Sequence, residues 1–315
     1  MRDKPDQGQE PKLAGPQTEG RPEGTRIAKF LARAGIESRR GVERMIEAGR
    51  ITVDGTRLTT PAFFVTGNER IAVDGNVVEA AQDTRLWRYH KPTGLVTSHA
   101  DEKGRDTVFD AMPDDMPRVI SVGRLDLNSE GLLLLTNDGA LARKLELPKT
   151  GWTRTYKVRA YGQTDQKRLD RLAKGVMLDG RRTGPIMATL LPGSGNNVWI
   201  KVQLTEGKNR EVRRAMESID LQVNRLIRTS FGPFELGGLA KGALAEISGR
   251  QLRAAIKAGP HRQRRAQAED DKDKVKVKSN PDKAKPSWNK AKPNRGKAKS
   301  DRSKAKPSRG RNADH

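Results

Sequence analysis

Hydrophobic positions recur at helical spacing near the start of the chain and then give way to short strand patterns. The first predicted helix carries its apolar residues on one face: Ile27, Phe30, Leu31 and Ala34. Gly35 ends this pattern, Ser38 suits the N-cap of a second helix, and Gly49 ends that helix. Short strands are predicted at residues 51–53 and 71–73, and each precedes an Asp-Gly turn.

Strand patterns dominate from about residue 84 onward. Residues 87–92 and 119–122 predict two strands, and a polar loop bounded by Gly123 and Gly131 runs directly into four consecutive leucines. Further stretches fit alternating strands at 152–161 and 198–204, followed by a helix that begins near residues 207–214. Many short strands with a few late helices predict an α+β domain rather than a regular βαβ array.

The two ends of the chain lack such patterning. Residues 1–24 and 259–315 are rich in Pro, Gly and charged side chains, and we expect both segments to be disordered. Residues 261–315 carry +12 of the net charge of +23 and repeat Lys-Ala-Lys-Pro three times. This tail suits a tether on phosphate backbones, although a solvated extension that aids solubility is the simpler interpretation. The folded part then divides into modules at 25–82 and 84–258.

Composition narrows the classes of function. The 62 Lys and Arg against 39 Asp and Glu predict a polyanionic partner. The absence of Cys excludes disulfides, thiolate metal sites and thiol catalysis, and the four scattered histidines make a metal cluster or a His-based triad implausible. No apolar run approaches the ~18–20 residues of a membrane span, and the start of the chain does not resemble a secretory signal. We therefore expect a cytoplasmic protein without membrane contact.

Basic side chains surround the predicted core of the first module. RNA contacts are predicted for Arg26, Lys29, Arg33, Arg39, Arg40 and Arg50. The alternative is a solvated face on which these cations pair with Glu37, Glu43 and Glu47. The segment TRIAKFLARAGIESRRGVERMIEAGRITVDG resembles the S4 RNA-binding domain, which implies recognition of folded RNA by shape and phosphate contacts. Such a domain supplies no chemistry by itself.

The second module resembles a family of enzymes. VGRLDLNSEGLLLLTNDG, RTYKV, LTEGKNREVRRAM and LIRTSFGPFELGGLAKGALAEI are similar, in this order, to motifs of bacterial ribosomal-RNA pseudouridine synthases with an N-terminal S4 domain. The resemblance covers about residues 25–255 and implies an S4-like domain followed by a mixed, mainly antiparallel sheet flanked by helices. HKPTGLVTSHADEKGRDTVFDAMP is most similar to enzymes of the large subunit, which implies 23S ribosomal RNA as substrate.

The resemblance also implies roles for individual residues. Conversion of uridine to pseudouridine breaks the N1–C1′ bond and rejoins the base through C5, so no cofactor is required. The matching aspartate is Asp126, a nucleophile that attacks at C1′ or C6 or acts through a glycal, and Arg213 is its cationic partner. Tyr156 packs on the target base, which must first be flipped out of the RNA. The remaining predicted RNA contacts are Arg124, Lys208 and Arg210.

Three alternatives stay open at the level of sequence. The chain could be a non-catalytic RNA-binding or ribosome-assembly protein, an N-glycosylase that also uses a carboxylate, or an enzyme of the same family that acts on 16S ribosomal RNA. A monomer is expected, because the RNA supplies the large interface.

Overall fold

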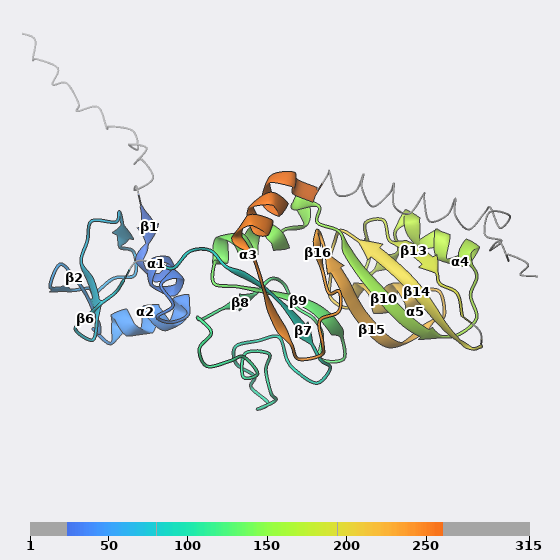
Figure 1. Ribbon diagram of the computed structural model, residues 1–315, viewed down its shortest axis with the longest axis horizontal. Helices are drawn as coiled ribbons and strands as arrows, with labels where there is room; N and C mark the ends of the chain where they lie inside the picture. Colours follow the sequence, from blue (N-terminus) through green and yellow to red (C-terminus); the bar gives the residue numbers. More distant parts are fainter. Residues whose placement is uncertain (1–23, 80, 194, 261–315) are drawn as a thin grey trace, which may run out of the picture. The chain divides into compact units, whose positions relative to one another are not determined.

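The computed structural model describes residues 24–260 except 80 and 194, and within this range the fold is α+β as predicted (Figure 1). The predicted disorder of residues 1–24 and 259–315, with the Lys-Ala-Lys-Pro repeat, lies outside the described residues except at positions 24, 259 and 260. Residues 259 and 260 belong to the helical stretch 249–260, so the folded part extends two residues further than predicted.

The first module contains two helices and small sheets. Helices α1 (Ile27–Arg33) and α2 (Arg39–Glu47) match the predicted helices, and the Ser38 hydroxyl caps α2 by accepting a hydrogen bond from the Gly41 N–H at 2.9 Å. Strands β1 (Thr25–Arg26) and β4 (Phe64–Val65) pair with each other. The second sheet has the order β3–β2–β5–β6, with β2 (Ile51–Val53), β3 (Thr56–Arg57), β5 (Ile71–Val73) and β6 (Asn76–Val77). Both Asp-Gly pairs form the predicted hairpin turns.

A nine-stranded sheet forms the centre of the second module (Figure 1). Its main path runs β13–β14–β10–β15–β9–β7–β17, and the short strands β16 and β8 attach to β15 and β9. The strands are β7 (Leu86–Lys91), β8 (Ile120–Ser121), β9 (Glu130–Thr136), β10 (Arg154–Tyr161), β13 (Met187–Leu190), β14 (Asn197–Leu204), β15 (Gln222–Phe231), β16 (Phe234–Glu235) and β17 (Leu244–Ile247). All pairs are antiparallel except β15 with β9, so the sheet is mixed and mainly antiparallel. A separate small hairpin joins β11 (Met177–Leu178) and β12 (Arg181–Arg182).

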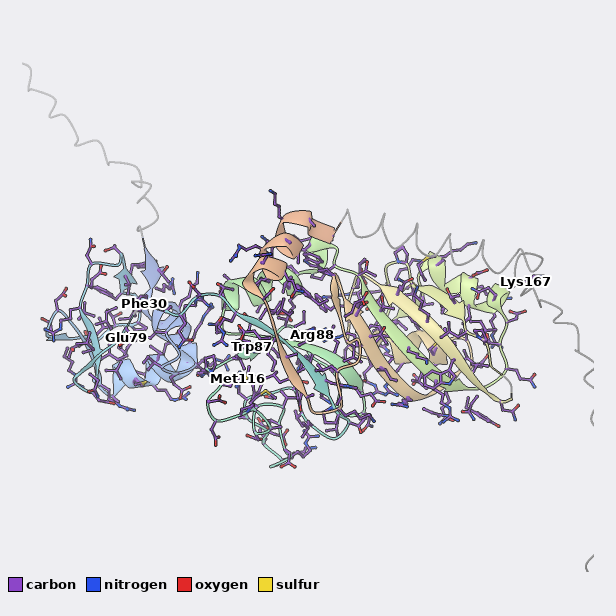
Figure 2. All side chains as sticks on the ribbon, in the orientation of Figure 1. Phe30, Glu79, Trp87, Arg88, Met116 and Lys167 are labelled. Atoms are coloured by element: carbon purple, nitrogen blue, oxygen red, sulfur yellow. The ribbon has the colours of Figure 1, made fainter. Side chains whose placement is uncertain are left out.

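Strand β9 is buried on both faces, as its run of leucines predicts. Leu133 and Leu135 belong to one core, with α5 (Glu211–Glu217), α4 (Gln166–Asp170) and the 3₁₀ turn η2 (Arg171–Lys174). Leu132 and Leu134 belong to a second core, with α3 (Gly139–Glu146) and the helical residues 249–260. Another 3₁₀ turn, η1 (Pro148–Thr150), follows α3. Figure 2 shows how densely side chains fill this module around Trp87 of β7, which is buried in the first core, whereas Lys167 of α4 is exposed.

Gly131 allows β9 and β15 to approach each other. Its φ is +105°, and a Cβ atom at this position would lie 2.4 Å from the Arg228 carbonyl oxygen. A side chain is therefore excluded both by backbone conformation and by space. The predicted loop ends one residue earlier than expected, because β9 begins at Glu130, and this extra length brings the polar loop against β15.

Candidate active site

A cavity of about 660 Å³ opens in the second module, within the range of small-molecule sites. Its lining comes from the loop before β9, from β10 and β15, and from the residues that lead into α5. Asp126 and Tyr156 both line it, together with the predicted RNA contacts Arg124, Lys208 and Arg210. Residues far apart in the sequence thus meet around one space of suitable size for an extruded base.

The loop that carries Asp126 is held by hydrogen bonds to its backbone. The Thr97 hydroxyl donates to the Leu125 carbonyl at 2.9 Å, and the Gly94 N–H donates to the Leu127 carbonyl at 2.9 Å. Within the loop, the Ser129 N–H donates to the Asp126 carbonyl at 3.0 Å. The carboxylate itself stays 36% exposed and reaches the cavity from a fixed backbone.

Lys91 also holds this loop in place, a role that the sequence did not predict. Its side chain is fully buried, and its ammonium donates to the carbonyls of Pro92, Asp126 and Ser129 at 2.9, 3.2 and 3.1 Å. Burial lowers its pKa to about 8, although the negative charges of Asp126 and Glu130 oppose this shift. The only available signal was a lysine at the end of a strand, directly before a proline.

Within the described residues, Asp126 lies within ion-pair distance of Arg210. Arg210 Nη1 lies 4.0 Å from Asp126 Oδ2, whereas the sequence predicts a phosphate contact for Arg210. Arg213 is buried and donates to the carbonyls of Asn128 at 2.8 Å and Val223 at 3.1 Å. Burial lowers the pKa of Arg213 and the charge of Arg210 adds to this, while Asp126 opposes both effects. Arg213 therefore interacts with the Asp126 carboxylate through its charge, and its hydrogen bond to Asn128 holds the backbone of the loop that carries Asp126.

Tyr156 lies between two buried arginines on the cavity side of β10. Its cross-strand neighbours are Val202 on β14 and Arg228 on β15. Arg154, two residues earlier on the same face, donates to the carbonyls of Trp152, Thr205 and Glu146. Both arginines also lie near the Phe231 ring, 4.6 Å for Arg154 and 5.4 Å for Arg228. The tyrosine ring is therefore packed in a rigid frame at the wall of the cavity.

A pair of carboxyl groups borders the same space. Glu211 at the start of α5 is buried, and burial raises its pKa, with the neighbouring Glu206 acting in the same direction. Lys208 forms an ion pair with Glu206 at 2.8 Å, which lowers the pKa of Glu206. Lys208 is thus already engaged by a protein carboxylate, although its side chain remains accessible.

The predicted RNA contacts of the first module fall into two groups. Arg26, Lys29, Arg39 and Arg40 are exposed, and in the described part of the chain none of them pairs with Glu37, Glu43 or Glu47. Arg50 instead forms a 2.5 Å ion pair with Asp74. The exposed group keeps its charge available for phosphate.

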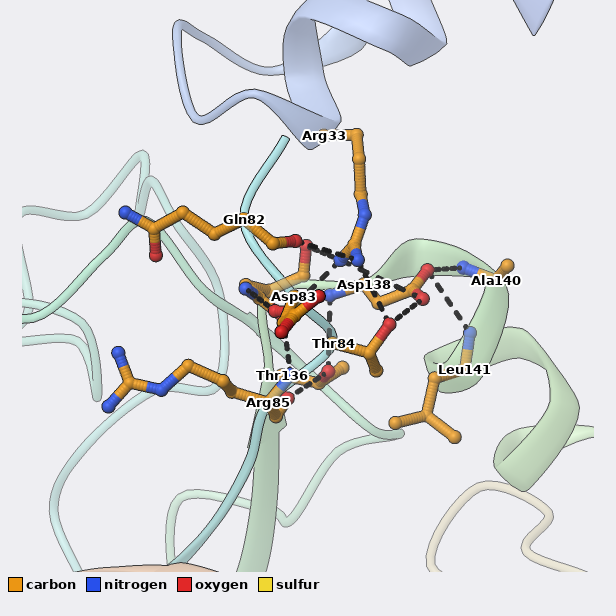
Figure 3. Close-up of polar contacts among 10 residues, drawn as sticks. Arg33, Gln82, Asp83, Thr84, Arg85, Thr136, Asp138, Ala140 and Leu141 are labelled. Carbon is orange, nitrogen blue, oxygen red and sulfur yellow. Dashed lines mark hydrogen bonds and ion pairs between the residues drawn. The ribbon is translucent and has the colours of Figure 1, made fainter. Parts of the chain in front are cut away.

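Arg33 is committed to protein acceptors, as Figure 3 shows. Its guanidinium donates to the carbonyl of Asn137 at 3.0 Å, the Thr84 hydroxyl at 2.9 Å and the carbonyl of Gln82 at 3.1 Å, with Asp138 at 3.7 Å. Asp138 also caps α3 by accepting hydrogen bonds from the Ala140 and Leu141 N–H groups. Both terminal nitrogens of Arg33 thus donate to protein acceptors, which disfavours the predicted RNA contact at this residue.

The described residues hold no group of three or more His, Cys, Asp or Glu side chains arranged for a metal ion. Within the same residues, no helix is long and apolar enough to cross a lipid bilayer.

Comparisons with known proteins agree with this architecture. Residues 25–71 match the S4 domain, and residues 85–218 match the RNA pseudouridylate synthase family. The chain is 46% identical over 227 residues to a protein of Rickettsia felis named "Uncharacterized RNA pseudouridine synthase", covering 72% of this chain and 98% of the relative. The chain belongs to the RNA pseudouridine synthase family. As a member of that family it is an RNA-binding enzyme, and the resemblance drawn from its motifs is confirmed.

Two further similarities concern a relative with a more specific name and a solved structure. The synthase is 40% identical over 262 residues to "Ribosomal large subunit pseudouridine synthase B" of Salmonella typhi, covering 80% of this chain and 90% of that protein. A solved structure titled "Crystal structure of pseudouridylate synthase" aligns with a TM-score of 0.52 at 22% identity, covering 74% of this chain and all of that one. The latter similarity concerns the fold alone.

Proposed function

We propose that this synthase converts a specific uridine of large-subunit (23S) ribosomal RNA to pseudouridine. The observation that carries the proposal is the 40% identity to "Ribosomal large subunit pseudouridine synthase B" across most of both chains. The exposed basic side chains of the S4 module support an RNA substrate with folded structure. We further propose that the synthase works as a cytoplasmic monomer.

Asp126 is the proposed nucleophile. Its carboxylate lines the cavity on a loop with fixed backbone, and Arg210 Nη1 lies 4.0 Å from its Oδ2. Arg213 then acts as a positioning residue, since it bonds the carbonyl of Asn128 in the same loop. A carboxylate can attack a sugar carbon or an electron-poor ring carbon, so attack at C1′, attack at C6 and the glycal route all fit this placement.

Tyr156 is proposed to pack on the flipped uracil and to receive the proton that leaves C5. Its place on the cavity wall, within one space shared with Asp126, supports this role. During the reaction the N1–C1′ bond breaks and a C5–C1′ bond forms, while C5 loses a proton and N1 gains one. The reaction therefore needs proton transfer but neither an oxidant nor a metal ion.

RNA docking is proposed to use Arg26, Lys29, Arg39 and Arg40 of the first module and Arg124 beside the cavity. Lys208 and Arg210 are proposed to bind phosphate while they keep their contacts with Glu206 and Asp126, respectively. The Lys/Arg-rich segment 261–315 would add non-specific attraction.

Pseudouridine mapping in ribosomal RNA from cells with and without the synthase tests the substrate. We expect one position of 23S ribosomal RNA to remain uridine in the deletion strain. Plasmid-borne wild type and the control Asp179→Asn should restore it, since Asp179 is an exposed partner of Arg214. Asp126→Asn should not restore it.

Each alternative has its own outcome, either in this mapping or in measurements on a labelled transcript. A missing position in 16S ribosomal RNA would overturn the large-subunit assignment. Release of free uracil from a labelled transcript would indicate an N-glycosylase, and RNA binding without any modified position would indicate a non-catalytic binding protein.

A further inference from the structure

Three buried polar atoms beside the cavity lack a hydrogen-bond partner within the described chain. They are Ser129 Oγ, Glu211 Oε1 and Arg228 Nη2. Their residues are 1%, 3% and 2% exposed, and all three line the cavity. Buried polar groups normally find a partner, and one left without destabilises the fold. The cavity is therefore prepared for a ligand that itself carries polar atoms.

Arg228 is the most informative of the three because its charge is permanent and its position is fixed. In β15 it lies opposite Tyr156 of β10 on one side and Gly131 of β9 on the other. Directly opposite residues on neighbouring strands project from the same face with Cβ atoms about 5 Å apart. The guanidinium is thus a neighbour of the tyrosine proposed to pack on the target base.

Contacts on two sides hold the Arg228 guanidinium in place. Its Nε donates to the Leu132 carbonyl at 2.7 Å, and its centre lies 5.4 Å from the Phe231 ring. The neighbouring Arg154 differs, because both of its terminal nitrogens donate to backbone carbonyls. Arg228 is therefore the buried arginine of this wall with a donor left for a ligand.

The chemistry of uracil suits such a donor. When the N1–C1′ bond breaks, the electron pair stays on the base and spreads onto the carbonyl oxygens O2 and O4. A fixed guanidinium N–H stabilises this charge more than it stabilises the neutral nucleoside, which is the condition for lowering the barrier. The charge disappears again when C5 bonds to C1′, C5 loses its proton and N1 takes one up.

We propose that Arg228 Nη2 donates a hydrogen bond to a carbonyl oxygen of the extruded uracil and holds the base while it is detached. The inference rests on the proposed pseudouridine synthase reaction and adds the residue that retains the base. Rotation by half a turn about the axis through N3 and C6 exchanges N1 with C5 and also O2 with O4. One immobile donor therefore meets an equivalent oxygen before and after the rotation, which explains how the base can turn without escaping.

A substrate with one oxygen exchanged for sulfur tests this contact. An RNA hairpin carrying the mapped uridine is prepared with uridine, 2-thiouridine or 4-thiouridine at that position, and single-turnover conversion is measured. Sulfur accepts hydrogen bonds weakly, so we expect at least one exchange to slow the wild type roughly 10- to 100-fold, the range of a charge-assisted hydrogen bond. Wild-type rates unchanged by both exchanges would overturn the proposal without any variant.

The variant Arg228→Gln then identifies the donor. Its single-turnover rate on the uridine substrate should fall roughly 10- to 100-fold. The sulfur exchange that slows the wild type should slow this variant by less than about threefold. Arg159→Gln, on the exposed face of β10, serves as the matched control and should keep the full sulfur effect. A merely structural Arg228 would lower all three rates by the same factor, and that result would overturn the proposal.

Folding of the variant is checked by tryptophan fluorescence, and Arg228→Lys provides a second variant with the positive charge retained. Arg228→Lys should also lose sensitivity to sulfur, because its single ammonium has no atom in the place of Nη2. A wild type that forms no pseudouridine in any ribosomal RNA would instead disprove the proposed substrate, and this outcome is recognised before any Arg228 variant is compared.

Discussion

Replacement of the buried Lys91 tests how the Asp126 loop is supported. Lys91→Met keeps most of the side-chain volume but removes the ammonium that donates to three carbonyls. The Asp126 carbonyl keeps a second donor, the Ser129 N–H at 3.0 Å. The carbonyls of Pro92 and Ser129 lose the Lys91 donor, so the loss concentrates on these two acceptors.

The size of the effect follows from these two acceptors. A buried acceptor left without a donor costs about 1–3 kcal/mol, which gives about 2–6 kcal/mol for the pair. Part of this is recovered, because burial of the ammonium is itself unfavourable, as its lowered pKa of about 8 indicates. We expect a net loss of about 2–4 kcal/mol in the free energy of unfolding. A shift of the loop by about 1 Å would also lower the turnover rate about 100-fold.

Urea unfolding followed by tryptophan fluorescence measures the stability. Of the four tryptophans, Trp87, Trp152 and Trp199 lie in the second module and none lies in residues 24–79, so the signal reports the catalytic part of the described chain. Lys167→Met, on the exposed surface of α4, is the control and should change stability by less than about 0.5 kcal/mol.

The pH dependence provides an independent check. Between pH 8 and 10.5 the unfolded chain binds a proton at Lys91 that the folded chain has released, so this lysine makes stability rise with pH in that window. Lys91→Met should lack this rise. Equal pH dependence in both proteins, or a loss below about 1 kcal/mol, would refute the proposed support of the loop.

Three further perturbations address other parts of the chain. Gly131→Ala should cost more than about 3 kcal/mol by urea unfolding, because its Cβ would lie 2.4 Å from the Arg228 carbonyl oxygen at a strained φ. Gly180→Ala shares a positive φ but has open space, so a comparable loss there would disprove the clash. Glu211→Gln should remove a decline of stability as pH rises above 4.5, since the raised pKa lets the folded chain bind more protons than the unfolded chain there; an unchanged slope contradicts this. Deletion of residues 261–315 should flatten the plot of log RNA affinity against log salt, and an unchanged slope would show that the tail makes no contact.

The local elements could be predicted from sequence because local physics decides them. The apolar spacing around Ile27 and the Ser38 cap give α1 and α2, and the four leucines at 132–135 give a strand buried on both faces. The central position of β15 in the sheet could not be predicted in the same way. Its burial alternates only over part of its length, and its position in the middle of the sheet depends on pairing with β10 and β9, which are distant in sequence.

The sequence brought some residues of the cavity to notice but did not predict their contacts. Motif order pointed to Asp126 and Tyr156, and both line one cavity. The choice between Arg210 and Arg213 as neighbour of Asp126 depends on the left-handed backbone of Arg210 and on the start of α5, which sequence spacing does not reveal. The contacts of Lys91 and Arg228 could not be predicted from the sequence. Both side chains donate to backbone carbonyls, and which carbonyl lies nearby depends on the fold and not on residue type.

The parallel contact between β9 and β15 has a consequence for how the chain reaches its working form. Only two residue pairs join these strands, and they connect segments separated by most of the catalytic module. Closing so long a loop is entropically slow, so we expect this seam to form late in folding. The loop with Asp126 precedes β9, and Tyr156 lies on β10 at the far side of β15, so a half-folded intermediate lacks the assembled cavity. Binding of the extruded nucleotide, unlike docking of RNA on the first module, therefore requires the finished catalytic module.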